Sequence, residues 1–333
     1  MTVVKAIFSN FIPFLMAMIL TLTPNTQSNV FGTIDNVKKD CNATVELISD
    51  IHIEAKGLLR TSMLELGLKN LDRSKVTIDG VVVCGDLTNY ADEPSIAKYF
   101  EIIKESSPAP VISVAGNHDI GHAGDRDVTD ISREEAKANF IKYYNEYSGS
   151  NITTTYYSTE INGYKFIVLG DDVIDGGHFD AVDISPEQLA FLDRELASGT
   201  ASGKPVFVCC HWPVDGTNGQ ETIWPGCGID LEKNDIKTIM EKYENVFYIS
   251  GHMHSGIKSR EFEEQYGFSN AEVLNGVTYL SIPSYGLVNS FGLPQCGTGA
   301  QLEIYDDEVV FRPRNFVLNK WYENSEYHFE IAK

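Results

Sequence analysis

Short apolar runs that end abruptly in polar residues constrain the fold of this 333-residue chain more than any other feature. Such runs, rich in β-branched residues and bounded by polar residues or glycine, are typical of buried strands rather than amphipathic helices. A strand without a polar face must lie in a sheet that is covered on both sides. Six runs of this kind occur, at 45–49, 81–84, 111–115, 166–169, 206–210 and 246–249.

The segments between several of these runs have the spacing of helices. Ser185-Pro186 begins one of them with a residue that caps helices and a proline at the first helical position. Strands that alternate with helices predict βαβ units in an α/β domain. The expected helical segments are 57–70, 95–105, 133–147, 185–196 and 231–242.

The helical pattern stops after about residue 270. Three further strands are expected beyond that point, at 277–282, 301–305 and 309–312. No linker separates them from the preceding segments, so we expect them to form a second sheet packed onto the first within one domain.

The composition is that of a folded, acidic protein. Hydrophobic residues make up 43% of the chain, which is enough to bury a full core and excludes global disorder. The formal net charge of −21 would repel a nucleic-acid backbone, so we expect no nucleic-acid partner. A small anionic substrate is compatible with this charge, because a bound metal cation would outweigh the global field locally.

The N-terminus has the pattern of a secretory signal peptide. Lys5 precedes an apolar run at 6–22, and small polar residues follow at 23–28. We therefore expect residues 1–28 to be a cleaved leader and the protein to be secreted, either periplasmic or extracellular. The alternative is an uncleaved membrane anchor, although the densest apolar part is shorter than the ~20 residues of a membrane span. No other segment has that length, so no stable span is expected after cleavage.

Five of the six cysteines lie in two kinds of surroundings, and Cys41 stands alone near the expected mature N-terminus. Cys84, Cys209 and Cys210 fall within apolar runs, where a thiol usually behaves as a small hydrophobic side chain. Cys227 and Cys296 lie in glycine-rich loops, and in an exported protein they are the expected disulfide pair.

The polar residues that follow the apolar runs form a consistent set. Five of the eight histidines belong to it. Each group follows a strand whose carboxyl end is expected at one edge of a sheet, which is where α/β proteins bind ligands. The groups are Asp50-Ile51-His52, Gly85-Asp86, Gly116-Asn117-His118-Asp119, His211 and Gly251-His252-Met253-His254.

These residue types suit two divalent metal ions. Imidazole and carboxylate are ligands of Zn, Mn and Fe, and an amide oxygen can complete a ligand shell. One carboxylate can bridge two ions roughly 3.5–4 Å apart, the separation used in phosphoester hydrolysis. The Asp-x-His and His-x-His pairs are expected to project from one side of an extended segment. Taken singly, each group has an ordinary explanation: His211 could be a buried, hydrogen-bonded histidine, and Asp119 could cap a turn or a helix.

The order of these groups resembles that of the calcineurin-like metallophosphoesterase superfamily, over residues 44–285. The resemblance implies an α/β fold, a four-layer α/β/β/α sandwich of two mixed sheets flanked by helices. We place this domain at 41–320 and a C-terminal tail at 321–333.

The resemblance also implies a role for each polar residue. One metal ion would be held by Asp50, His52 and His254, and the other by Asn117, His211 and His252. Asp86 would bridge the two ions. His118 resembles the family's non-ligand histidine, which protonates the leaving oxygen, and Asp119 beside it could favour the charged imidazole.

One position of the chain differs from the pattern of a branch of this superfamily. The purple acid phosphatase branch has a tyrosine ligand three positions after the bridging aspartate, and this chain has Asn89 there, with Tyr90 one position late. We therefore expect no iron–tyrosinate site. The plain Asp-x-His form looks more like bacterial-type phosphodiesterases, including those that act on cyclic nucleotides.

The predicted function is metal-dependent hydrolysis of a phosphodiester or phosphomonoester, with a small phosphorylated compound as substrate. Water activated by two Fe, Mn or Zn ions would attack phosphorus as hydroxide, with His118 as general acid. Two alternatives keep the fold: a nucleotide pyrophosphatase that uses the same site, and a non-catalytic metal-binding scaffold. A scaffold is expected to lose ligands or the acid histidine, whereas all seven ligand positions and His118 are present.

Three aromatic residues near the motifs have two explanations each. Trp212, Trp224 and Tyr285 could form apolar walls for an organic group of the substrate, or they could be ordinary core aromatics.

Overall fold

The computed structural model describes residues 28–31, 34–120, 131–171, 181–231, 234–257, 263, 267–286, 296–322 and 325–332. The expected signal peptide at 1–28 therefore lies outside the described residues, except for its last position. Within the described ranges, no helix combines the length and the apolar character needed to cross a membrane.

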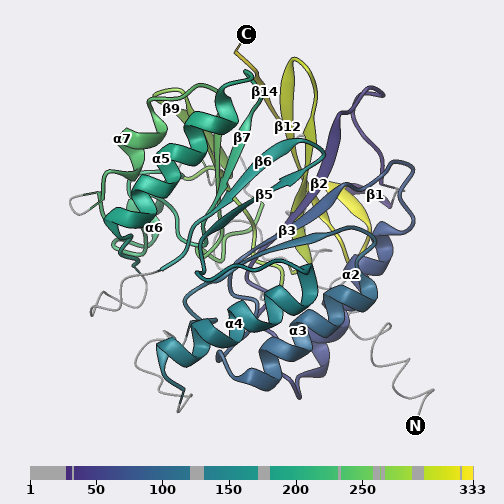
Figure 1. Ribbon diagram of the computed structural model, residues 1–333. Coiled ribbons are helices and arrows are strands. Elements are labelled where there is room, and N and C mark those ends of the chain that lie inside the picture. Colours follow the sequence, from purple (N-terminus) through teal and green to yellow (C-terminus); the bar gives the residue numbers. More distant parts are fainter. Residues whose placement is uncertain are drawn as a thin grey trace.

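Two mixed sheets form the centre of the fold (Figure 1). The first has the order β1-β13-β12-β11-β2-β3-β4, with β14 paired to β12, and only β2, β3 and β4 are parallel to one another. Its strands are β1 (Ser28–Phe31), β2 (Ala43–Ile48), β3 (Gly80–Cys84), β4 (Val111–Val114), β11 (Thr298–Ile304), β12 (Glu308–Asn315), β13 (Lys320–Tyr322) and β14 (Tyr327–Glu330).

The second sheet has the order β5-β6-β7-β8-β10-β9, and its central strands β6, β7, β8 and β10 are parallel. Antiparallel neighbours close both of its edges. Its strands are β5 (Tyr157–Ile161), β6 (Tyr164–Val168), β7 (Val206–Cys209), β8 (Val246–Ser250), β9 (Ala271–Leu274) and β10 (Val277–Ser281).

Helices cover the outer faces of the two sheets, which gives the predicted four layers. Figure 1 shows α2, α3 and α4 together on one side of the molecule and α5, α6 and α7 on the other. Side-chain oxygens of Asp92 and Ser185 cap the first turns of α3 and α5, and Pro186 begins α5 as predicted. The helices are α2 (Leu58–Leu71), α3 (Glu93–Ser106), α4 (Arg133–Ser148), α5 (Pro186–Thr200), α6 (Gln220–Ile223) and α7 (Ile236–Met240).

The late strands do not form a sheet of their own, and that expectation was wrong. The strand β10 joins the second sheet beside β8, whereas β11 and β12 extend the first sheet from β2. The segment that we set apart as a tail, 321–333, contributes part of β13 and all of β14 to the first sheet.

The predicted disulfide between Cys227 and Cys296 is wrong. All six cysteines lie in described ranges, and none of them forms a disulfide bond. Cys227 is buried in a small cluster with Met253 and Phe268, whereas Cys296 belongs to the main core. Both side chains are therefore accounted for by packing, as cysteine commonly is in protein interiors.

A buried ion pair crosses the first sheet. Glu46 on β2 and Arg314 on β12 are both fully buried, and Arg314 Nη1 lies 3.3 Å from Glu46 Oε1. Burial raises the pKa of Glu46 to about 7, because the loss of solvation outweighs the attraction of Arg314, and Glu303 adds to the rise.

The Glu46→Gln variant tests this shift through the pH dependence of stability. The folded protein binds a proton at Glu46 between pH 4.5, its ordinary pKa, and about 7, whereas the unfolded chain has released it. The free energy of unfolding of the wild type should therefore fall relative to that of Glu46→Gln by about 3 kcal/mol as pH rises through this window. Urea denaturation of both proteins from pH 4.5 to 8 measures the difference. A difference that stays constant with pH would contradict the raised pKa.

Candidate metal centre

The predicted site residues follow the carboxyl ends of parallel strands from both sheets. In chain order they are Asp50 and His52 after β2, Asp86 after β3, Asn117 and His118 after β4, His211 after β7, and His252 and His254 after β8. The packing of the two sheets brings these strand ends together. Asp50 and His254, which are 204 positions apart in sequence, therefore lie at one site.

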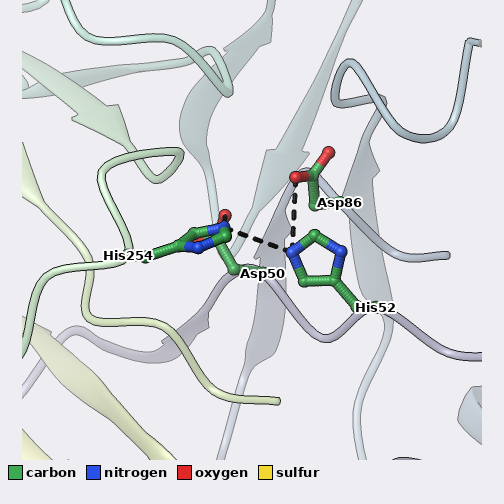
Figure 2. Close-up of side chains that lie close together, drawn as sticks. All are labelled: Asp50, His52, Asp86 and His254. Carbon is green, nitrogen blue, oxygen red and sulfur yellow. Dashed lines mark hydrogen bonds and ion pairs between the residues drawn. The ribbon is translucent and has the colours of Figure 1, made fainter. Parts of the chain in front are cut away.

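The first cluster takes two carboxylates and two imidazoles from three of these strand ends (Figure 2). One ligand atom of each residue lies within 4.8 Å of the others in the group Asp50, His52, Asp86 and His254. His52 Nε2 lies 3.2 Å from His254 Nε2 and 3.5 Å from Asp86 Oδ2. His254 Nε2 is 3.3 Å from Asp50 Oδ1. The donor atoms thus converge on a space the size of a cation site.

The second cluster is built around His211. Its Nε2 lies 3.3 Å from Asp86 Oδ1, 3.2 Å from His252 Nδ1 and 3.2 Å from Asn117 Oδ1. Asp86, His211 and His252 meet the distance requirement for a metal group by themselves, and the Asn117 amide oxygen adds a fourth donor. Every one of these side chains is buried.

Asp86 belongs to both clusters because its two oxygens face different sides. Its Oδ2 lies on the side of His52, and its Oδ1 lies on the side of His211. The backbone N–H of His118 also donates to Oδ1, at 3.1 Å. A carboxylate divided in this way is the geometry that a bridging ligand between two metal ions requires.

The buried donor atoms of the two clusters are arranged as a bound cation requires. Both carboxylate oxygens of Asp50 are buried and accept no hydrogen bond, although an uncompensated buried carboxylate is costly. His211 Nδ1 faces the carbonyl oxygen of Cys84 at 2.9 Å, so this nitrogen carries the proton. The lone pair of neutral His211 then points from Nε2 at the oxygens of Asp86 and Asn117, an arrangement that a cation stabilises.

The charges of the site shift the pKa values of its members strongly. Burial opposes ionisation of Asp86, but the imidazoles of His211, His118 and His52 outweigh it and hold the pKa of Asp86 well below its ordinary value. Burial lowers the pKa of His211, and the carboxylates of Asp86 and Asp50 outweigh that effect and raise it to about 9. The carboxylates therefore attract positive charge to this position, whether it is a proton or a metal ion.

The backbone of the candidate ligands differs from the extended form that we expected. Five of them have left-handed φ angles between 45° and 66°: Asp50, His52, Asp86, His252 and His254. This conformation is uncommon outside glycine and costs about 1 kcal/mol or more for each residue. Members of each Asp-x-His or His-x-His pair do reach one site, but they do so through tight kinks after the strand rather than along an extended segment.

Glycines beside the ligands are required by close packing. A Cβ atom at Gly85 would overlap the imidazole of His211. At Gly251 it would overlap the side chains of Ser49 and Asp50, and at Gly116 it would overlap Asp86. The loops can therefore approach each other at the site only where side chains are missing.

The structure separates the roles of His118 and Asp119. His118 Nε2 lies 4.0 Å from Asp86 Oδ2, its ring packs edge-on against His52, and 23% of its side chain is exposed. The expected pairing of Asp119 with His118 is not found. The buried carboxylate of Asp119 instead accepts hydrogen bonds from Leu87 N, Thr88 N, Thr88 Oγ1 and Gly116 N. Asp119 thus joins the loops after β3 and β4, which is the capping alternative.

Only one of the three candidate aromatic walls is partly exposed. Trp212 and Tyr285 are buried, and Tyr285 Oη donates to the Met63 carbonyl at 2.7 Å, so both are core residues. Trp224 is half-buried and stacks on the candidate ligand His252, with ring centroids 5.2 Å apart and planes 11° apart.

Several contacts of the site carry no signal in the sequence. The Cys84 carbonyl holds His211 Nδ1, and the Asn89 carbonyl accepts from His118 Nδ1 at 2.8 Å. Backbone carbonyls are common to all residue types, so no motif marks them. Position 89 departs from the purple acid phosphatase pattern in its side chain, whereas it is the carbonyl group of Asn89 that contacts His118.

The chain belongs to the calcineurin-like phosphoesterase family, whose family model matches residues 44–256. It is 28% identical over 178 residues to a probable cyclic nucleotide phosphodiesterase of Xenorhabdus bovienii. That match covers 54% of this chain and spans 62% of the length of the relative. The family match therefore extends over more than half of this chain, whereas the curated relative is matched over less than two thirds of its length.

Two solved structures share the fold. A dimetal phosphatase from Danio rerio matches with a TM-score of 0.55 and 15% identity, over 88% of this chain and 100% of that one. A purple acid phosphatase from yellow lupin (Lupinus luteus) seeds matches with a TM-score of 0.57 and 14% identity, over 86% of this chain and 53% of that one. At these identities the similarity concerns the α/β architecture alone.

The Gly116→Ala variant tests the placement of Asp86. A methyl group at this position would displace the Asp86 carboxylate, so we expect the variant to retain at most one metal ion for each chain after reconstitution with Mn or Zn. Elemental analysis of the desalted protein measures the metal content.

Gly276→Ala is the matched control. Gly276 lies between β9 and β10 with φ at +85° and no atom near its added Cβ. This variant should lose about 1 kcal/mol of stability and keep its full metal content. If Gly116→Ala also keeps two ions, Asp86 does not lie between them.

Proposed function

We propose that the chain hydrolyses phosphodiesters at a dinuclear metal centre, with His118 as general acid. The observation that carries this proposal is the division of Asp86 between the two clusters, one oxygen toward each. In this assignment Asp86 would contribute to holding both ions. Asp50, His52 and His254 would hold one of them, and Asn117, His211 and His252 would hold the other.

The metal ions would complement what the chain supplies. When bound, two divalent cations stabilise charge on the phosphoryl oxygens and lower the pKa of water. Asp50 and Asp86 offset about half of the roughly four positive charges of two such ions, which leaves the site attractive to a phosphate. Asn117 contributes a neutral oxygen and the four histidines contribute neutral nitrogens, so no further negative charge opposes substrate binding.

His118 has the position and the tautomer that a general acid needs. The Asn89 carbonyl can only accept a hydrogen bond, so His118 Nδ1 carries a proton and Nε2 is left to face the centre. The His118 side chain is partly exposed, unlike the buried candidate ligands His211 and His252, which supports access of a substrate to it. A protonated Nε2 could then donate to the leaving oxygen.

A diester is the substrate class that we favour. The curated relative is named as a probable cyclic nucleotide phosphodiesterase, and the plain Asp-x-His motif is present here. Trp224 adds a half-exposed aromatic surface stacked on a candidate ligand, where an aryl or nucleoside group of a diester could lie. A nucleotide pyrophosphate linkage would use the same residues, and it is the second candidate.

We also propose that the protein is exported and that its leader is removed. The order of basic residue, apolar run and small polar residues in the first 28 positions supports this. N-terminal sequencing of the protein recovered outside the cytoplasm would test it, and a mature chain that still begins at Met1 would contradict it.

A paired hydrolysis assay tests the proposed activity. We expect Mn- or Zn-loaded protein to hydrolyse a bis-aryl phosphodiester with a higher kcat/KM than an aryl phosphomonoester, and chelation of the metal to abolish both activities. Asp86→Asn should lower kcat by about 100-fold or more, because the bridging charge is lost. His118→Ala should lower it by about 100-fold on esters with poor leaving groups.

The other outcomes have definite meanings. A preference for the monoester would identify a phosphatase. Turnover of a dinucleotide pyrophosphate without turnover of either ester would identify the second candidate. Two bound ions with no hydrolysis of any of the three substrates would leave the non-catalytic scaffold.

A further inference from the structure

We infer that Glu54 and Asn89 are positioning residues that hold His118 in its reactive orientation. This inference rests on the proposed function, in which His118 is the general acid. The contact concerned is the 2.8 Å hydrogen bond from His118 Nδ1 to the Asn89 carbonyl oxygen. Because the imidazole can rotate about its side-chain bonds, the place of this carbonyl group decides where Nε2 points.

The Asn89 carbonyl is fixed by contacts on both sides of the residue. Asn89 N donates to the Ile53 carbonyl oxygen at 3.0 Å, which continues the parallel pairing of the segments that follow β2 and β3. The Asn89 side-chain Nδ2 donates to Glu54 Oε1 at 2.9 Å. Residue 89 is therefore tied through its backbone and its side chain to the segment that carries His52.

Glu54 is in turn connected to Arg60 at the start of α2. Arg60 Nη1 lies 3.8 Å from Glu54 Oε1 and donates to the His52 carbonyl oxygen at 2.9 Å. Arg60 thus contacts the backbone of the candidate ligand His52. Glu54 contacts Asn89, whose carbonyl group accepts from the candidate acid His118.

The exposure of Glu54 and Arg60 indicates how much their contact stabilises the fold. The Glu54 side chain is 45% exposed and that of Arg60 is 27% exposed, so their ion pair contributes little to the stability of the fold. The side chain at position 89 donates to Glu54, which is not a member of either cluster.

The chemical step that this orientation serves is protonation of the leaving group. Hydrolysis replaces the P–O bond to the leaving group by a P–O bond to water. His118 Nε2 gives its proton to the leaving oxygen as that bond breaks, and it regains the proton that water releases. A misplaced Nε2 would slow the reaction only where the leaving oxygen needs the proton.

A series of aryl methyl phosphodiesters provides the test. Their leaving groups run from 4-nitrophenol, which departs readily without a proton, to phenol, which does not. We expect Glu54→Ala to lower kcat/KM about tenfold for the phenyl ester and less than about threefold for the nitrophenyl ester, a fraction of the full effect of a general acid. Glu54→Gln keeps an acceptor for Asn89 Nδ2, so it should restore most of the lost activity.

Two further variants make the test independent of any one substitution. Asn89→Ala removes the same hydrogen bond from the other side, and it should reproduce the leaving-group dependence even if Glu54→Ala fails to fold. Glu101→Ala removes an exposed ion pair with Lys98, 3.1 Å long, on α3, and it should leave both rates unchanged. Metal content, measured for every variant, should stay at the wild-type value.

The outcomes separate this inference from the function on which it rests. His118→Ala should show the same leaving-group dependence to a greater degree. If it slows both esters equally, the general-acid role of His118 is wrong. If His118→Ala shows the dependence and neither Glu54→Ala nor Asn89→Ala does, or if these two lose metal or slow both esters equally, the positioning inference is overturned.

Discussion

The site depends on one carboxylate that faces two ways. Asp86 lies between a cluster that contains His52 and one that contains His211, and each of its oxygens is directed to one of them. An ionised carboxylate in a buried position is unfavourable by itself, and the imidazoles around it offset that cost. The other candidate ligands lie around this aspartate, and the close glycines and the loop contacts of Asp119 let the loops approach one another there.

The placement of groups around Asp86 requires backbone conformations that are unfavourable by themselves. Five candidate ligands have left-handed φ angles, and the loops after β2, β3 and β8 leave their strands through sharp kinks. Such conformations persist only where the surroundings determine them, and here the determining contacts are visible. The N–H groups of Ile51 and His52 both donate to the Asp86 carbonyl oxygen, and the Asp119 carboxylate holds the backbone of Leu87 and Thr88. The strands direct the loops toward the site, and these contacts fix the position of the loop backbone within it.

The sequence predicts more of the site than of the topology. Apolar runs followed by acidic and imidazole side chains identify the strand ends and the candidate ligands, because burial and metal chemistry both leave residue-type signals. Sheet membership leaves none: β11 pairs with β2, more than 250 residues away, and nothing in its composition distinguishes it from β10. The glycine-rich loops of Cys227 and Cys296 predicted a disulfide, whereas each cysteine packs in its own apolar cluster. The carbonyl groups of Cys84 and Asn89 are invisible in sequence for the same reason: every residue has one.

The distribution of the ligands over two sheets has a consequence for the order in which the protein is assembled. The first sheet carries Asp86 but is completed only when β11, near the end of the chain, pairs with β2. The second sheet brings His211 and the histidines after β8. The first cluster therefore requires the whole stretch from Asp50 to His254, and the second requires the stretch from Asp86 to His252. Contacts between such distant parts of a chain are slow to form. During synthesis, neither cluster can form before β8 and the loop after it have been made and the two sheets have packed together.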